Sequence, residues 1–414
     1  MKSVIKFLVP SLLLIATAGC KKTYLETAPS NAVTQVQLFS NTVTTAAAQN
    51  GTYSELYAYG TGGSTGHDNF GQKALDLAND LMGNDMVVNT AGYGWFNADY
   101  QYTEWTHPQD QRRSYNAWYL YYDIIKQSNF VITYVGNATG AQADKDVLRG
   151  QALGLRAFCY FYLINDMQQT YKGNETKPGV PIYTAAASGI PVPVARGTVQ
   201  DVYTQMITDL TAAETLLTGK TVPDKNHIDV HVVQGLRARV ALLMEDWPTA
   251  VTYAHKAYQG FTLMSQTDYQ KGFNDLTNSE WMWGSSISAA QSTIYASWWS
   301  HIDASVGGYA TLGSQKKITK ALYDQINASD VRKQVFVGPG AGNSTFPDYD
   351  QVKFEVADPN SFAGDYLYMR AAEMYLIEAE AYSRQGMDGP ARTSLQNLIK
   401  TRYPAYSAAA LSGA

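Results

Sequence analysis

Two segments of the sequence have the pattern of paired helices, and this pattern constrains the fold more than any other feature. They read RARVALLMEDWPTAVTYAHKAY from Arg237 and IEAEAYSRQGMDGPARTSLQNLI from Ile377. In each, a helix with small residues on one face is followed by a tight turn with proline and then by a second helix that opens with alanine. Because small residues allow two helices to approach closely, each segment predicts a pair of packed helices.

Helical periodicity recurs elsewhere in the chain, with residues spaced three and four apart on one face. One such face is formed by Trp118, Tyr122, Ile125, Asn129 and Ile132, and another by Val202, Met206, Leu210, Ala213 and Leu217. Further helices are predicted at residues 148–164, 232–244, 249–258, 366–384 and 390–402, and the clearest strand at 280–284. The paired segments resemble tetratricopeptide hairpins. We therefore expect a mainly α fold of tetratricopeptide-like helix hairpins with long irregular loop insertions and a few short strands.

The predicted helices are separated by stretches rich in glycine, serine and asparagine that exceed ordinary connections. These stretches cover residues 60–70, 84–111, 285–313 and 338–364. Two of them are also rich in aromatic residues, with GYGWFNADYQYTEW from Gly92 and TIYASWWSH from Thr293. Because long loops on a helical scaffold usually carry function, these two stretches are the first candidates for a binding site.

The N-terminus has the features of an export signal that ends in a lipidated cysteine. Two lysines precede an apolar run that is too short to span a bilayer, and small residues precede Cys20. We expect acylation of Cys20 and cleavage before it, while an ordinary secretory leader with an incidental cysteine is the alternative. The expected organisation is a signal peptide at 1–19, a lipidated N-terminus and polar tether at 20–40, and a single domain at 41–414.

Composition describes a globular chain. A net charge of -5, with 16% charged residues and no basic patch, argues against a nucleic acid partner. Beyond Cys20 the chain has one cysteine, Cys159, which lies among apolar residues in RAFCYFYL. This cysteine is predicted to be a buried thiol.

Several motifs, in this order, resemble the SusD/RagB family of outer-membrane nutrient-binding lipoproteins over nearly the whole chain. AWYLYYDIIKQSNFVI from Ala117 is similar to a family helix with Trp, Tyr, Ile and Asn at fixed spacing. RGQALGLRAFCYFYLINDM from Arg149, followed by GVPIYT, is similar to the most recognisable family helix. The segment DYLYMRAAEMYLIEAEAY is similar to a third motif through Arg370, Glu373, Tyr375 and Glu378.

Two departures from the family accompany this resemblance. Gln151 stands where the family usually has Glu, which removes one expected charge contact. The sequence also ends at Ala414, where family members normally continue through another acidic and arginine-rich segment, so we expect a truncated member.

The resemblance implies a cell-surface lipoprotein that captures oligosaccharide or polysaccharide and delivers it to a SusC-like TonB-dependent transporter of the outer membrane. Which glycan it takes stays open, and some relatives take peptide or glycoprotein material. A helical-repeat scaffold for another protein and a glycoside hydrolase are the alternative functions.

The aromatic loops also suit a sugar ligand, because the C–H face of a sugar ring can lie on an aromatic ring while its hydroxyls bond polar side chains. The candidate ligand-binding residues are Tyr93, Trp95, Phe96, Asn97, Tyr100, Tyr295, Trp298 and Trp299. Four other aromatic residues are expected in the core. Trp118 and Tyr122 follow a helical stripe, and Trp281 and Trp283 alternate as on a buried strand.

The sequence contains no H-E-x-x-H and no glycine-rich phosphate loop. Paired carboxylates such as Asp80 and Asp85 are too common among 36 acidic residues to indicate a hydrolase. His227 and His231 have the spacing of a metal pair on a helix, but no third ligand is evident nearby. We therefore expect a binding protein, not an enzyme, with no cofactor and no metal.

Overall fold

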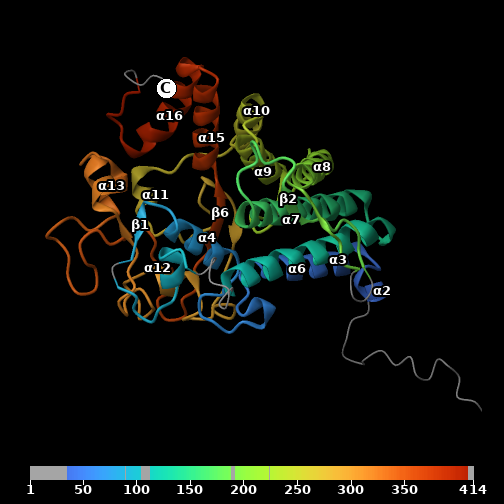
Figure 1. Ribbon diagram of the computed structural model, residues 1–414, viewed down its shortest axis with the longest axis horizontal. Coiled ribbons are helices and arrows are strands. Elements are labelled where there is room, and N and C mark those ends of the chain that lie inside the picture. Colours follow the sequence, from blue (N-terminus) through green and yellow to red (C-terminus); the bar gives the residue numbers. More distant parts are fainter. Residues whose placement is uncertain (1–34, 89, 104–111, 188–191, 223, 409–414) are drawn as a thin grey trace, which may run out of the picture.

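The computed structural model describes residues 35–408 apart from 89, 104–111, 188–191 and 223. The predictions made for Cys20, the signal peptide and most of the tether lie outside these residues. The described chain is mainly helical, with short strands that form three two-stranded antiparallel sheets (Figure 1). The predicted fold class is confirmed. No described helix combines the length and the apolar character that crossing a membrane requires.

The elements of the first half of the chain are α2 (Gln35–Leu38), α3 (Thr42–Ser54), η2 (Thr61–Gly63), α4 (Gln72–Leu81), β1 (Met86–Val87), α5 (Asn97–Tyr100), α6 (Arg112–Tyr134), η3 (Val135–Asn137), α7 (Gln142–Met167), β2 (Pro178–Pro181), β3 (Arg196–Thr198) and α8 (Val199–Leu217). Those of the second half are α9 (Val230–Leu243), α10 (Trp247–Ala257), α11 (Gln266–Tyr269), β4 (Trp281–Ser285), α12 (Trp298–Ile302), β5 (Lys317–Ile318), α13 (Lys320–Gln325), α14 (Val331–Gln334), β6 (Tyr366–Arg370), α15 (Ala371–Arg384) and α16 (Asp388–Arg402). The strands pair as β1 with β5, β2 with β3 and β4 with β6.

The long helices pack one after another in a curved array. Helix α6 packs on α7, α7 on α8, α8 on α9 and α9 on α10, and α10 then packs on α15, which packs on α16. The two helix pairs predicted from the sequence are therefore present as α9 with α10 and α15 with α16. Figure 1 shows this array at the right and top, with α12, α13 and β1 at the left.

Helix α7 packs between α6 and α8, and its sequence explains how closely its neighbours approach. A Cβ atom at Gly150 would lie 2.7 Å from Leu217 Cγ of α8, so only glycine fits there without a shift. One turn further along, a Cβ at Gly154 would lie 3.0 Å from Ile228 Cγ2. Cys159 of α7 is fully buried, as predicted, and burial holds the pKa of its thiol well above the usual value.

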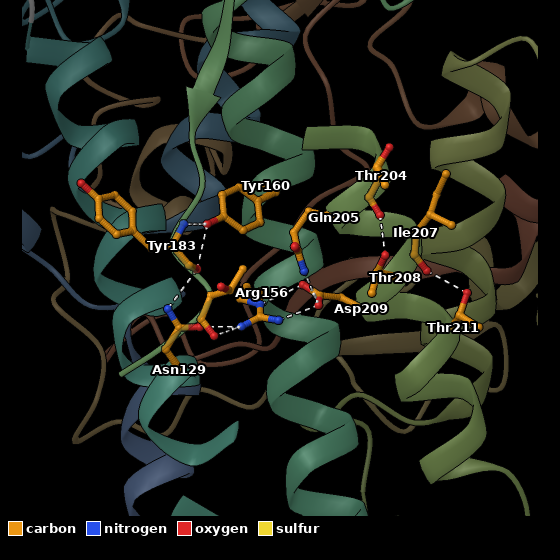
Figure 2. Close-up of polar contacts among 11 residues, drawn as sticks. Asn129, Arg156, Tyr160, Tyr183, Thr204, Gln205, Ile207, Thr208, Asp209 and Thr211 are labelled. Atoms are coloured by element: carbon orange, nitrogen blue, oxygen red, sulfur yellow. Dashed lines mark hydrogen bonds and ion pairs between the residues drawn. The ribbon is translucent and has the colours of Figure 1, made fainter. Parts of the chain in front are cut away.

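A buried guanidinium joins three of these helices. Arg156 of α7 donates to both carboxylate oxygens of Asp209 in α8, and its Nη1 donates to Asn129 Oδ1 of α6 at 2.7 Å (Figure 2). Asn129 Nδ2 in turn donates to the carbonyl of Tyr183 at 3.0 Å. The segment that follows β2 is thereby fixed against α6 and α7.

The strand predicted at 280–284 is confirmed as β4, and the side chains of Trp281 and Trp283 are fully buried. The helix predicted over 366–384 is wrong at its start, because residues 366–370 form β6. These residues pair with β4, and the helix begins only at Ala371, whose N–H donates to the carbonyl of Glu280 at 2.9 Å. A strand partner about 85 residues earlier in the chain is not visible in local periodicity.

Candidate functional site

Two adjacent arginines at the start of α6 anchor the loops that carry the site. Arg113 is almost completely buried, and its Nε and Nη2 each lie 3.0 Å from a carboxylate oxygen of Asp99 in α5. Arg113 also donates to the carbonyl of Asp68 at 2.9 Å, while Arg112 lies 2.9 Å from the Asp68 carboxylate. The loop around residue 68 and the short helix α5 are therefore held against one end of α6.

Five rings from three loops meet beside this anchor, and we call them the aromatic cluster: His67, Tyr93, Trp95, Tyr295 and Tyr309. The imidazole of His67 is stacked with Trp95 at 5.6 Å and with Tyr295 at 6.5 Å between ring centroids. Tyr309 contacts the rings of Tyr93, Trp95 and Tyr295, and its hydroxyl lies 2.6 Å from His67 Nδ1. The structure thus brings together the two aromatic loops that the sequence singles out.

The aromatic cluster is partly open to solvent. Tyr93 is 68% exposed and Tyr295 is 46% exposed, while Trp95 is half-buried. The Nε1 of Trp95 is buried and has no acceptor among the residues that the structure describes. The guanidinium of Arg112 lies 5.6 Å from the Trp95 ring. Such a surface offers stacking and hydrogen bonding together, which is what a sugar ring requires.

His301 supports the aromatic cluster from the interior. It is fully buried and stacks on Tyr309 at 4.9 Å and on Phe70 at 5.4 Å. Its Nε2 lies 2.9 Å from the carbonyl of His67, and because a carbonyl can only accept, Nε2 carries the proton. Burial, with nearby positive charge from Lys316, lowers the pKa of His301 well below its usual value, so the ring is neutral.

Three of the predicted site residues do not present their rings to solvent. Trp298 is 4% exposed, and Trp299 and Phe96 are also buried. The two tryptophans begin helix α12 and pack in the core, where Trp299 Nε1 donates to the carbonyl of Gly364 at 2.9 Å. The expectation that these indoles lie on an open loop is wrong, because a chain segment 65 residues away covers them.

The remaining predicted residues lie near the cluster or belong to it. Asn97 and Tyr100 are half-buried in α5, beside the anchor formed by Asp99.

Two aromatic residues predicted in the core are not fully buried. The expectation that Trp118 lies in the core is wrong, since it is 39% exposed on α6, and Tyr122 is only half-buried.

Sequence reasoning missed three residues of this site. His67 and Tyr309 lie in two of the predicted long loops, and Arg112 lies at the end of a third loop. A polar residue amid GGSTGHDNF was the available signal for His67, but nothing local marks Tyr309 as its partner.

The pair of histidines considered for a metal is split by the fold. His227 Nδ1 lies 2.7 Å from Asp224 Oδ1 and its Nε2 lies 2.8 Å from Asn50 Oδ1, whereas His231 packs against Phe261. Within the described part of the chain, no three His, Cys, Asp or Glu side chains are grouped to hold a metal ion.

Comparison with known proteins gives this geometry a context. Residues 63–242 match a family of SusD-like proteins described as starch-binding and associating with the outer membrane. The crystal structure of a SusD-like carbohydrate binding protein from Bacteroides vulgatus is 30% identical to this chain, with a TM-score of 0.76, and the match covers 88% of this chain and 75% of that one. The chain belongs to the SusD family.

Two more distant solved structures share the SusD fold. A putative sugar binding protein from Bacteroides vulgatus is 22% identical, with a TM-score of 0.74 and coverage of 90% of this chain and 80% of that chain. Surface glycan-binding protein A from Bacteroides thetaiotaomicron is 17% identical, with a TM-score of 0.63 and coverage of 89% and 84%. No curated protein matches the sequence.

The structure explains why the SusD motif of α15 has its residues. Glu373 accepts two hydrogen bonds from Arg239 of α9, at 2.6 and 2.7 Å, and Tyr375 stacks on Tyr258 at 4.0 Å. Glu378 lies 2.9 Å from His255 of α10 and also accepts from Ser394 of α16. These residues hold α15 between its neighbouring helices and lie away from the aromatic cluster.

Proposed function

We propose that this SusD-family protein captures oligosaccharide or polysaccharide at the aromatic cluster and does not cleave it. The observation that carries the proposal is the convergence of Trp95 and Tyr295 from distant loops onto one imidazole, with Tyr295 exposed and Trp95 half-buried. Stacked aromatic faces with polar groups at their edge suit the alternating C–H and hydroxyl surfaces of sugars. The names of the similar proteins, which include carbohydrate and glycan binding, support the same ligand class.

We further propose that the bound glycan is delivered to a SusC-like TonB-dependent transporter, with the protein held at the cell surface by acyl chains on Cys20. The support is the family description, which includes association with the outer membrane, together with the lipoprotein-like leader of the sequence. In this organisation residues 1–19 are removed, 20–40 form the tether and 41–414 form the binding body.

Titration of the full chain in mild detergent with a panel of polysaccharides, followed in parallel by measurement of released reducing ends, tests the first proposal. Binding without release is the expected result. Release of reducing ends that persists after repeated purification would instead favour a glycoside hydrolase, and no binding to any polysaccharide would favour a scaffold for another protein.

A further inference from the structure

One face of α6 carries a row of aromatic side chains that the aromatic cluster does not use. Tyr115, Trp118, Tyr119 and Tyr122 are spaced three and four residues apart, so they share a face of the helix. The first three are exposed, at 50%, 39% and 43%, and the last is half-buried. Large exposed aromatic groups gathered on one face commonly mark a binding surface.

A cleft of about 400 Å³ lies at the far end of this row, between α6 and the segment after β2. Its apolar walls include Trp118, Tyr122 and Tyr183, and Asp123 and Lys126 add a carboxylate and an ammonium group. The Trp118 and Tyr122 rings are 4.7 Å apart, and Tyr183 meets Tyr122 edge to face at 5.8 Å. This size and lining, mostly apolar with a few polar groups, is typical of small-ligand sites.

Hydrogen bonds hold the walls of the cleft in place. The Tyr122 hydroxyl donates to the carbonyl of Pro181 at 2.8 Å. The backbone of Tyr183 is held on both sides, because its N–H donates to the Tyr160 hydroxyl at 2.7 Å and its carbonyl accepts from Asn129 (Figure 2). Since Arg156 fixes Asn129 in turn, the wall formed by Tyr183 is anchored to the buried network.

The cleft is connected to the aromatic cluster along α6. Arg112, which lies beside Trp95, begins the helix, and Tyr122 follows ten residues later, about 15 Å along the axis. Tyr115 bridges the interval, since its ring lies 6.1 Å from Tyr119 and its hydroxyl donates to the Gly62 carbonyl at 3.1 Å.

Gly62 allows close packing between the loop that carries His67 and the aromatic row of α6. Its φ of +73° is in the left-handed region, and a Cβ there would lie 3.0 Å from Tyr119 Cγ. The loop that carries Gly62 and His67 therefore packs directly on the aromatic row of α6.

We propose that the cleft on α6 is a second sugar-binding site and that a single polysaccharide chain contacts the aromatic cluster and the cleft at the same time. This inference rests on the proposed function. Continuity with the aromatic cluster favours the same ligand, and the cleft repeats the combination of ring faces with charged hydrogen-bonding groups. Two linked contacts on one chain raise the effective concentration at the second contact, so affinity increases with glycan length.

The experiment begins with the full chain in mild detergent and affinity electrophoresis through gels containing starch, levan, xylan or arabinogalactan. The polymer that retards the protein then supplies a trisaccharide and a longer oligosaccharide for calorimetric titration. We expect wild type to bind the longer ligand more tightly. Trp118→Ala should lower affinity for the longer ligand about tenfold, as expected for a lost stacking contact, and leave trisaccharide affinity unchanged.

Three further variants make the result specific. Tyr119→Ala should act in the same direction as Trp118→Ala, and Trp118→Phe should restore part of the affinity for the longer ligand. Trp247→Ala is the matched control, because Trp247 is a partly exposed tryptophan of α10, outside the aromatic row of α6. It should change neither affinity. Trp95→Ala should weaken the trisaccharide and the longer ligand alike.

The inference is overturned if Trp118→Ala and Tyr119→Ala bind the longer ligand as tightly as wild type does. If Trp95→Ala still loses glycan affinity in that case, the proposed function stands without the second site. It is also overturned if Trp118→Ala and Tyr119→Ala keep wild-type glycan affinity but no longer co-purify with a partner protein. The aromatic row of α6 would then be a protein interface. If no polymer retards wild type, the proposed function and this inference fail together.

Discussion

Arg156 and Asp209 form a buried ion pair in which one guanidinium donates two hydrogen bonds to one carboxylate, at 2.6 and 2.8 Å. Burial raises the pKa of Asp209, and the hydrogen bonds and charge of Arg156 oppose that shift. Removal of the arginine alone would leave the carboxylate buried without its partner. We expect Arg156→Met to lower the free energy of unfolding by about 3–5 kcal/mol.

Denaturant unfolding measures this change, and Arg156→Met with Asp209→Leu is the control. The double variant should recover part of the loss, because it buries no unpaired charge. Equal unfolding free energies for wild type and Arg156→Met would show that the ion pair contributes nothing to stability.

Trp95 and Trp298 should separate binding from stability. Trp95→Ala removes a half-buried ring of the aromatic cluster and should weaken glycan binding by about 1–3 kcal/mol. Trp298→Ala removes a buried indole of α12 and should cost about 3–5 kcal/mol of stability, without loss of affinity in the folded fraction. Titration and thermal melting of both variants check the assignment. An intact affinity in Trp95→Ala would remove this residue from the site.

Acidification should destabilise the protein through His301. The folded state keeps this buried ring neutral, whereas the unfolded chain takes up a proton below about pH 6.5. The unfolded state therefore binds more protons in acid, and stability falls as the pH drops below that value, by up to about 1.4 kcal/mol per unit.

The comparison variant for this effect is His301→Gln, whose amide can still donate to the His67 carbonyl but does not titrate. Its melting temperature should depend less on pH between neutrality and mild acid than that of wild type. Parallel pH profiles for the two proteins would assign the acid sensitivity to other groups.

Membrane attachment should depend on Cys20. Cys20→Ala removes the thiol that accepts lipid, so the variant should lose a fatty-acid label and leave the membrane fraction. Persistent label on Cys20→Ala would exclude acylation at this residue.

Wild type extracted in mild detergent should co-purify with a large β-barrel protein. A protein that is always recovered alone would count against the transporter.

The sequence predicted those features whose signal is local. The helix pairs are visible because small residues and turn residues recur within each segment, and the buried pair Trp281 and Trp283 follows from alternation along one strand. Helical periodicity identified the face of α6 that carries Trp118, but not what that face contacts. Ile125 and Asn129 on the same stripe are buried, whereas Trp118 is 39% exposed.

Contacts between distant segments decided the rest of the site. Trp298 lies in a stretch that looks like an open loop, yet Gly364 and its neighbours cover the tryptophans of α12. The pairing of His67 with Tyr309 joins residues 242 positions apart, so no spacing in the sequence could reveal it.

Cys159 gives the folded protein an internal reporter. The thiol is fully buried in α7 with a raised pKa, so it is almost entirely protonated and shielded at neutral pH. Alkylating reagents should therefore react with it only when α7 separates from its neighbours. The rate of that reaction would measure how often α7 separates from the helices packed on it, in native buffer and without any introduced cysteine.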